Sequence, residues 1–170
     1  MKKDKEFHTV RGYQILNSEN KLITSSMEDY LEMIYRTCLE DGYARINQLA
    51  MKLNVRPSST SKVIQKLRVL GLVDYEKYGI IRLTDKGKSL GNYLLKRHKI
   101  IEEFLVNLGI KESLLKDTEM IEHDISLNTL KCFYIFNEFL SKNPDVVKIY
   151  NAFKERYKNI DIDLSYPQNK

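Results

Sequence analysis

The order of patterns between residues 45 and 84 constrains the fold more than any other feature of the chain. It begins with two short amphipathic helical patterns, RINQLAMKLN and PSSTSKVIQKLRVLG, separated only by Val55 and Arg56. The second pattern starts at Pro57, and proline is tolerated at the first position of a helix because the N–H it lacks has no partner there. Two helices joined by so short a turn predict a helix-turn-helix.

The segment after these helices, LVDYEKYGIIRLT, changes from helical spacing to alternation. Apolar residues alternate on both sides of a turn at residues 77–79 that ends in glycine. This pattern predicts a β-hairpin within residues 72–84. Since a hairpin directly after a helix-turn-helix is the order of a winged helix, we expect a mainly α fold with a small β-hairpin wing.

Helical spacing also extends on both sides of this unit. Before it, a helix is predicted from an N-cap at Ser25 or Ser26 to a stop near Gly42. After it, apolar residues recur along one face from Thr84 to Gly109, which predicts a helix of roughly 23 residues, or about 35 Å. Three shorter helices are predicted over residues 111–124, 126–141 and 144–158. A boundary near residue 84 therefore separates a winged-helix half from an all-helical half.

Composition and charge limit the class of protein. The 170 residues are 42% hydrophobic and 30% charged, which is typical of a folded chain. The formal net charge of +5 is modest, but it leaves room for both a basic face and an acidic pocket. The sequence has no signal-peptide pattern and no apolar run of about 18 residues, so we expect a cytoplasmic protein without a membrane partner. Cys38 and Cys132 stand in apolar periodic segments, and we expect both to be buried free thiols.

The second helix of the helix-turn-helix carries hydroxyl and basic residues on its expected outward face. Hydroxyls at a helix N-terminus suit phosphate oxygens because free backbone N–H groups and the helix dipole point the same way, and Lys or Gln further along can reach base edges. The alternatives are a plain capped surface helix and a winged helix that binds protein. Together with the wing, the pattern favours double-stranded DNA. The candidate contacts are Arg45, Arg56, Pro57, Ser58, Ser59, Thr60, Ser61, Lys62, Gln65, Lys66, Lys77 and Tyr78.

A second candidate site combines carboxylates and histidines from several predicted helices. Glu119, Glu122 and His123 share one helical face through their i, i+3 and i+4 spacing. Asp29 and Glu32 share a face of the first helix by the same rule. Taken singly, each residue has an ordinary explanation, either as a first-turn acid on the helix dipole or as a solvated charge.

His98, on or beside the apolar face of the long helix, adds a second histidine, although a histidine at such a position, taken alone, is more often a satisfied core residue. A small bundle that packs these helices together gathers several like charges in one cleft, which is costly without a cation. Oxygen and imidazole ligands without thiolate suit Mn²⁺ or Fe²⁺ and argue against a zinc site built on cysteine. A hydrolytic metal centre uses similar ligands, but the chain has no accompanying nucleophile or Gly-rich phosphate loop. A regulatory metal is the simpler use, and we assign no catalytic residue.

Six stretches of the chain follow one another in an order and spacing that resemble a known family: SMEDYLEMIY, GYARINQLA, RPSSTSKVIQKL, YEKYGIIRLTDKGKSLG, KRHKIIEEFL and EMIEHDIS. The chain resembles the manganese transport regulator branch of the diphtheria toxin repressor family. This resemblance implies a homodimeric, metal-activated transcriptional repressor. It also implies an N-terminal winged helix followed by a helical metal-binding and dimerisation domain.

The resemblance also implies a set of metal ligands, position by position. The ligands of the manganese branch fall on Asp29, Glu32, His98, Glu119, Glu122 and His123. The iron-responsive branch has methionine at the position of Asp29 and cysteine at that of Glu119, whereas both positions here offer hard oxygen ligands. The resemblance therefore implies Mn²⁺ as the cofactor, with one or two ions per subunit and two expected, and leaves Fe²⁺ as an alternative.

These inferences divide the chain into a polar N-terminal extension (1–24), a winged-helix DNA-binding domain (25–84), a helical metal-binding and dimerisation domain (85–160) and a tail (161–170). The expected function is manganese-responsive repression of metal-uptake genes by a homodimer on operator DNA. Metal is expected to fix the dimer in its DNA-competent form. We expect no enzymatic activity and no small-molecule substrate. The alternatives are an iron-responsive regulator of the same family and a metal-independent winged-helix adaptor for DNA or protein.

Overall fold

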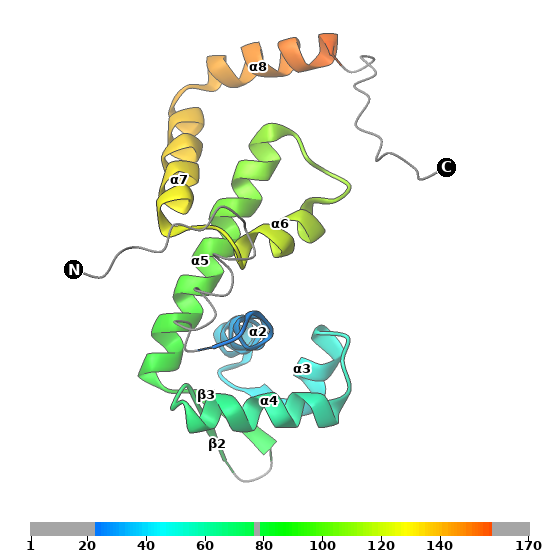
Figure 1. Cartoon of the computed structure of the whole chain (residues 1–170), viewed down its shortest axis with the longest axis vertical. Coiled ribbons are helices and arrows are strands. Elements are labelled where there is room, and N and C mark those ends of the chain that lie inside the picture. Colours follow the sequence, from blue (N-terminus) through cyan, green and yellow to red (C-terminus); the bar gives the residue numbers. More distant parts are fainter. Residues whose placement is uncertain (1–22, 77–78, 158–170) are drawn as a thin grey trace, which may run out of the picture.

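The computed structural model describes residues 23–76 and 79–157, and Figure 1 shows their arrangement. The elements follow in the order α2 (Ser25–Asp41), β1 (Ala44–Arg45), α3 (Ile46–Lys52), α4 (Pro57–Val69), β2 (Val73–Tyr75), β3 (Ile80–Leu83), α5 (Asp85–Leu108), α6 (Leu114–Glu122), α7 (Leu127–Lys142) and α8 (Pro144–Arg156). Most of the expected N-terminal extension, the wing-tip residues Lys77 and Tyr78, and the expected tail lie outside the described residues. The expected mainly α fold, a winged helix followed by a helical half, is confirmed.

Helix α2 is capped one residue before the predicted position. Its N-cap is Thr24, whose side-chain oxygen accepts a hydrogen bond from Met27 N at 3.3 Å, so the expected cap at Ser25 or Ser26 is wrong. Each of these hydroxyl residues is able to cap a helix, and local preference does not choose among three in a row. The predicted end is confirmed, because Gly42 takes the left-handed conformation (φ 79°) that closes the last turn.

The predicted hairpin is confirmed, with β2 antiparallel to β3, but the sheet has a third strand. Strand β1 pairs with β3 and sets Ala44 opposite Ile81. The helix expected from residue 45 therefore begins one residue later, at Ile46. A strand of two residues is too short to show an alternating pattern, and it is fixed by the strand beside it rather than by its own sequence.

Two apolar cores are joined by the long helix α5. Figure 1 shows this helix running from the winged-helix half into the helical half. The larger core lies among α2, the helix-turn-helix and the sheet, where Leu31 and Ile81 are fully enclosed. The smaller core lies among α5, α6 and α7, around Ile101 and Leu130. Helix α5 also contributes Leu94 to the larger core, so one continuous helix belongs to both halves of the molecule.

Helices α2 and α5 cross in close contact at Gly91. A Cβ built on this glycine would lie 2.7 Å from Cβ and 2.8 Å from Cγ of Tyr35, closer than side chains pack. Only glycine lets the two helices approach this far. The acidic residues that precede Tyr35 on α2 consequently face the middle of α5, where Arg97 and His98 lie.

The helical half differs from the prediction in its details. Helix α6 is shorter than the expected 111–124, and α7 packs on α5 along a single stripe that includes Leu130 and Asn137. Cys132 stands off this stripe and is exposed, so the expectation of a buried thiol is wrong there, whereas Cys38 is half-buried; both are free. Within the described ranges, no helix is both long and apolar enough to span a membrane.

We predict that Gly91→Ala destabilises the protein. Glycine to alanine inside a helix ordinarily stabilises by about 1 kcal/mol, but overpacking against Tyr35 costs about 1–3 kcal/mol, so the clash should win. Urea denaturation followed by circular dichroism measures the free energy of unfolding. Ser89→Ala, at an exposed position of the same helix, is the matched control and should not lower it. Equal or greater stability of Gly91→Ala would contradict the close crossing.

Candidate metal centre

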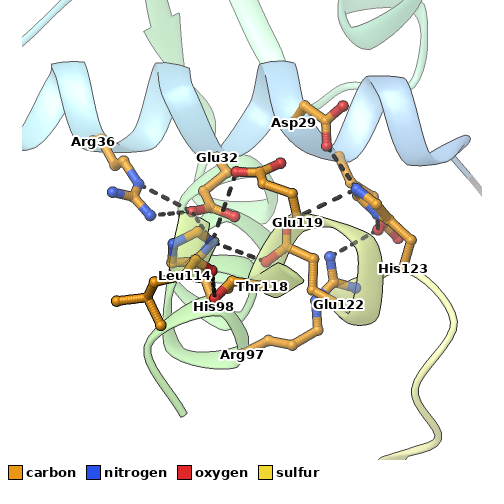
Figure 2. Close-up of polar contacts among 11 residues, drawn as sticks. Asp29, Glu32, Arg36, Arg97, His98, Leu114, Thr118, Glu119, Glu122 and His123 are labelled. Carbon is orange, nitrogen blue, oxygen red and sulfur yellow. Dashed lines mark hydrogen bonds and ion pairs between the residues drawn. The ribbon is translucent and has the colours of Figure 1, made fainter. Parts of the chain in front are cut away.

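The six candidate ligands come from three helices that meet at one place (Figure 2). They are Asp29 and Glu32 of α2, His98 of α5, Glu119 and Glu122 of α6, and His123 at the C-terminal cap of α6. Helical spacing places each pair of acids on one face, and the crossing of α2 over α5 turns these faces toward each other. The structure therefore brings together every residue that the sequence analysis assigned to this site.

The ligand atoms fall into two adjoining groups. The Asp29 group consists of Asp29, Glu119, Glu122 and His123; the Glu32 group consists of Glu32, His98 and Glu122. In each group the ligand atoms lie within 4.8 Å of one another. Glu122 is only 2% exposed and belongs to both groups. Because a carboxylate has two oxygens, this one residue can serve two neighbouring cations.

His123 carries the positive charge of the Asp29 group. Its Nε2 lies 2.9 Å from Asp29 Oδ1 and 3.8 Å from Glu122 Oε1. The contact with Asp29 and then the hydrogen bond with Glu28 raise the pKa of His123 to about 10, against the opposing effect of burial. The ring is therefore protonated at neutral pH, and a metal ion bound by this nitrogen takes the place of a proton.

His98 is the histidine of the Glu32 group, and it contacts carboxylates there as His123 does in the Asp29 group. Its Nδ1 donates a hydrogen bond to Glu122 Oε2 at 3.0 Å and lies 3.8 Å from Glu32 Oε1. The hydrogen bond with Glu122 raises the pKa of His98, while burial lowers it. Since His98 is 4% exposed, its ring contacts these carboxylates rather than water.

Several observations fit a divalent cation in this cluster. Asp29 Oδ1 is buried and has no well-aligned hydrogen bond, although it is within ion-pair distance of His123. Burial, followed by the neighbouring charges of Glu122 and Asp29, raises the pKa of Glu119, which shows that the carboxylates repel one another. A cavity of about 280 Å³ opens onto both groups. All ligand atoms are carboxylate oxygens or imidazole nitrogens, which suit Mn²⁺ or Fe²⁺.

Glu28 and Arg97 also belong to this centre, although the sequence analysis did not include them. Glu28 Oε2 accepts hydrogen bonds from Arg97 at 2.9 Å and from His123 Nδ1 at 3.0 Å, and both Glu28 and Arg97 are buried. The bond at Nδ1 orients the ring so that Nε2 is directed at Asp29, where a ligand atom is needed. In the sequence, Arg97 could be noticed only as the neighbour of His98, because the burial of Arg97 is visible only in the fold.

The candidate DNA-binding residues lie on the other half of the molecule, mostly on the exposed face of α4. Exposed side chains are those of Arg45, Arg56, Pro57, Ser58, Ser59, Lys62, Gln65 and Lys66, and Ser61 is half-buried. Thr60 is fully buried, so the expectation that it faces outward is wrong. Its hydroxyl lies 3.4 Å from Arg56 O and is used inside the first turn of the helix. Lys77 and Tyr78 lie outside the described residues.

Two family models match the chain. One is described as the N-terminal DNA-binding domain of iron-dependent repressors and matches residues 22–81. The other is described as the metal-binding and dimerisation domain of the same repressors and matches residues 84–151.

Relatives and solved structures agree with these models. The HTH-type transcriptional regulator MntR of Lysinibacillus sphaericus is 41% identical over 135 residues, which cover 79% of this chain and 97% of the relative. MntR of Oceanobacillus iheyensis is 39% identical over 140 residues, covering 81% and 95%. The solved structure of the manganese regulator SloR matches with a TM-score of 0.60 and 30% identity over 66% of this chain. That match spans 54%, or about half, of the SloR chain.

We predict that Arg97→Leu destabilises the metal-free protein by roughly 3 kcal/mol, because it removes the arginine partner of a buried carboxylate. Urea denaturation in the presence of a chelator measures this change. The matched control is Lys88→Leu on the same helix, which removes an exposed ion pair with Asp85 and should have little effect. If both variants unfolded at the same urea concentration as the wild type, Arg97 would not be needed to neutralise Glu28.

Proposed function

The chain belongs to the iron-dependent repressor family, and on this basis we propose that it is a manganese-responsive transcriptional repressor of metal-uptake genes. The resemblance seen in the sequence is thereby confirmed, and the relatives named MntR support its manganese branch. We propose a boundary between the two functional halves near residue 84, consistent with the family models. Because a transcriptional repressor acts on DNA inside the cell, we place the protein in the cytoplasm.

One observation carries this proposal: two adjoining groups of ligand atoms share Glu122 at the junction of the two halves. Asp29 and Glu119 complete the first group with carboxylate oxygens, and neither group includes a cysteine. Hard ligands of this kind favour Mn²⁺. The six residues are proposed as ligands of one or two ions, with two expected because the ligand atoms form two groups.

The positions of the ligands suggest how metal controls the protein. Asp29 and Glu32 lie on α2, which packs in the winged-helix core, whereas Glu122 and His123 lie on α6. A bound cation neutralises the carboxylates that otherwise repel across this junction. Both sets of side chains then hold α2 against α5 and α6, and this favours one orientation of the winged helix over others.

DNA recognition is assigned to α4 and is completed by a second copy of the chain. The hydroxyl and basic side chains at the start of α4 suit phosphates, and Lys62 and Gln65 are exposed one and two turns into the helix, where base edges can be reached. The family's dimerisation domain provides the second reading helix, and two helices that read one face of DNA are separated by about 34 Å. Metal fixes this separation when it fixes each winged helix. No step of this function requires catalysis.

We predict that Glu122→Gln strongly weakens Mn²⁺-dependent DNA binding, because it weakens both ligand groups at once while preserving side-chain volume. Fluorescence anisotropy with operator-containing DNA, with and without Mn²⁺, should show at least tenfold weaker binding, which is about 1.4 kcal/mol. Glu138→Gln, at an ion pair on α7, is the control and should behave like the wild type. Circular dichroism verifies that both variants fold. Unchanged Mn²⁺-dependent binding by Glu122→Gln would refute the proposed function.

For the DNA surface, we predict that Lys62→Ala lowers the salt dependence of binding. Loss of one phosphate contact should reduce the slope of log K against log[salt] by about 1. Lys148→Ala, on the exposed face of α8, removes the same charge far from α4 and should leave the slope unchanged. The same slope for Lys62→Ala and wild type would exclude this lysine from the interface.

An iron-responsive regulator is the second candidate, because the family models carry that description and imidazole–carboxylate ligands also suit Fe²⁺. Anaerobic titrations with Mn²⁺ and Fe²⁺, each read out by DNA binding, separate the two. If Mn²⁺ is the natural signal, it activates DNA binding at a lower free concentration than Fe²⁺ does, when each concentration is compared with the cellular supply of that metal.

A further inference from the structure

Arg36 lies one helical turn after Glu32 on α2 and already holds one of the candidate ligands (Figure 2). Its Nη2 lies 2.6 Å and its Nε lies 3.0 Å from the same oxygen, Glu32 Oε1. Two hydrogen bonds from a guanidinium to one carboxylate oxygen make a strong, charge-assisted contact. In the metal-free protein, therefore, a positive charge built into the chain neutralises Glu32.

The oxygen that Arg36 holds is the one that faces the Glu32 group. Glu32 Oε1 lies 3.8 Å from His98 Nδ1, which in turn donates to the shared Glu122. A metal ion that binds Glu32 through this oxygen has to displace the guanidinium, whose positive charge also repels the ion. Arg36 thus opposes an ion both by occupying the ligand atom and by its charge.

The Asp29 group has no such competitor. Within residues 23–76 and 79–157, no lysine or arginine lies within 4.0 Å of the carboxylates of Asp29, Glu119 or Glu122. Lys52 lines the same cavity but is bonded to Glu40 and Thr37. Among the described residues, competition from a guanidinium therefore acts on the Glu32 group only.

Arg36 also has a route away from Glu32. Its side chain is 36% exposed, whereas that of Glu32 is 9% exposed, and both line the cavity of about 280 Å³. The guanidinium can leave toward water without unfolding α2, whereas the carboxylate stays where it is. Replacement of Arg36 by a metal ion as the partner of Glu32 consequently requires only a movement of the arginine side chain.

We propose that Arg36 is a tethered cation that competes with metal for Glu32, so that the Glu32 group fills at a higher Mn²⁺ concentration than it would without this arginine. This inference rests on the proposed function, because it takes the six residues as Mn²⁺ ligands. Arg36 thus sets the Mn²⁺ concentration range over which the Glu32 group fills and over which the protein responds.

The test is a Mn²⁺ titration of metal-free, full-length protein, with free Mn²⁺ measured by electron paramagnetic resonance. The wild type should bind in two steps. In Arg36→Gln the second step should become about tenfold tighter, equivalent to about 1.4 kcal/mol, while the first changes by less than about twofold. Arg36→Lys retains the charge and should restore a weak second step. Lys142→Gln removes an exposed i,i+4 ion pair on α7 and should leave both steps unchanged.

Other results overturn the inference. A second step that is unchanged or weaker in Arg36→Gln would mean that Arg36 supports Glu32 as a ligand instead of competing for it. An equal shift in Lys142→Gln would reduce the effect to overall charge. Binding of a single ion by both wild type and Arg36→Gln would remove the second step altogether. If the wild type bound no Mn²⁺, the proposed function would fail as well, and that outcome is distinct from the other three.

Discussion

Negative charge is concentrated where α2 crosses α5 and meets α6, and the relation between the two halves of the molecule depends on how it is balanced. Glu28, Glu32 and Glu122 are all buried there. In the metal-free chain, His123 and the arginines of α2 and α5 supply the compensating charge, and His98 donates a hydrogen bond to Glu122. Since removal of one partner leaves an uncompensated buried charge, the cluster cannot relax piece by piece. Any change in the charge of this cluster therefore affects α2, α5 and α6 together.

Much of the fold and of the candidate site could be predicted from the sequence, because their signals are periodic. Helical spacing of three and four residues placed the acids on common faces, and the switch to alternation located the hairpin. Each candidate ligand is also an acidic residue or a histidine, and such side chains are uncommon at buried positions. The convergence of the three helices followed from the requirement that several buried acids share a counter-charge, and the family resemblance identified the members of the set.

The features that escaped prediction depend on tertiary contacts. Strand β1 exists because β3 lies beside Ala44, and Thr60 is buried because its side chain points into the helix-turn-helix rather than along the outward face. Glu28 is adjacent to Asp29 in sequence, yet it turns toward Arg97 and holds a ring that another helix supplies. In each case the residue type allowed both outcomes, and a neighbour distant in sequence selected one of them.

The close approach of Gly91 to Tyr35 has a mechanical consequence for how a signal could pass between the halves. The two helices already touch there, so α2 cannot move closer to α5 at this point. A bound ion that attracts Glu32 and Asp29 pulls on α2 nearer its start, on one side of this contact. It tilts α2 about the contact like a lever instead of drawing it in as a whole. The winged helix is built on the same α2, so a tilt of α2 would move the winged helix with it.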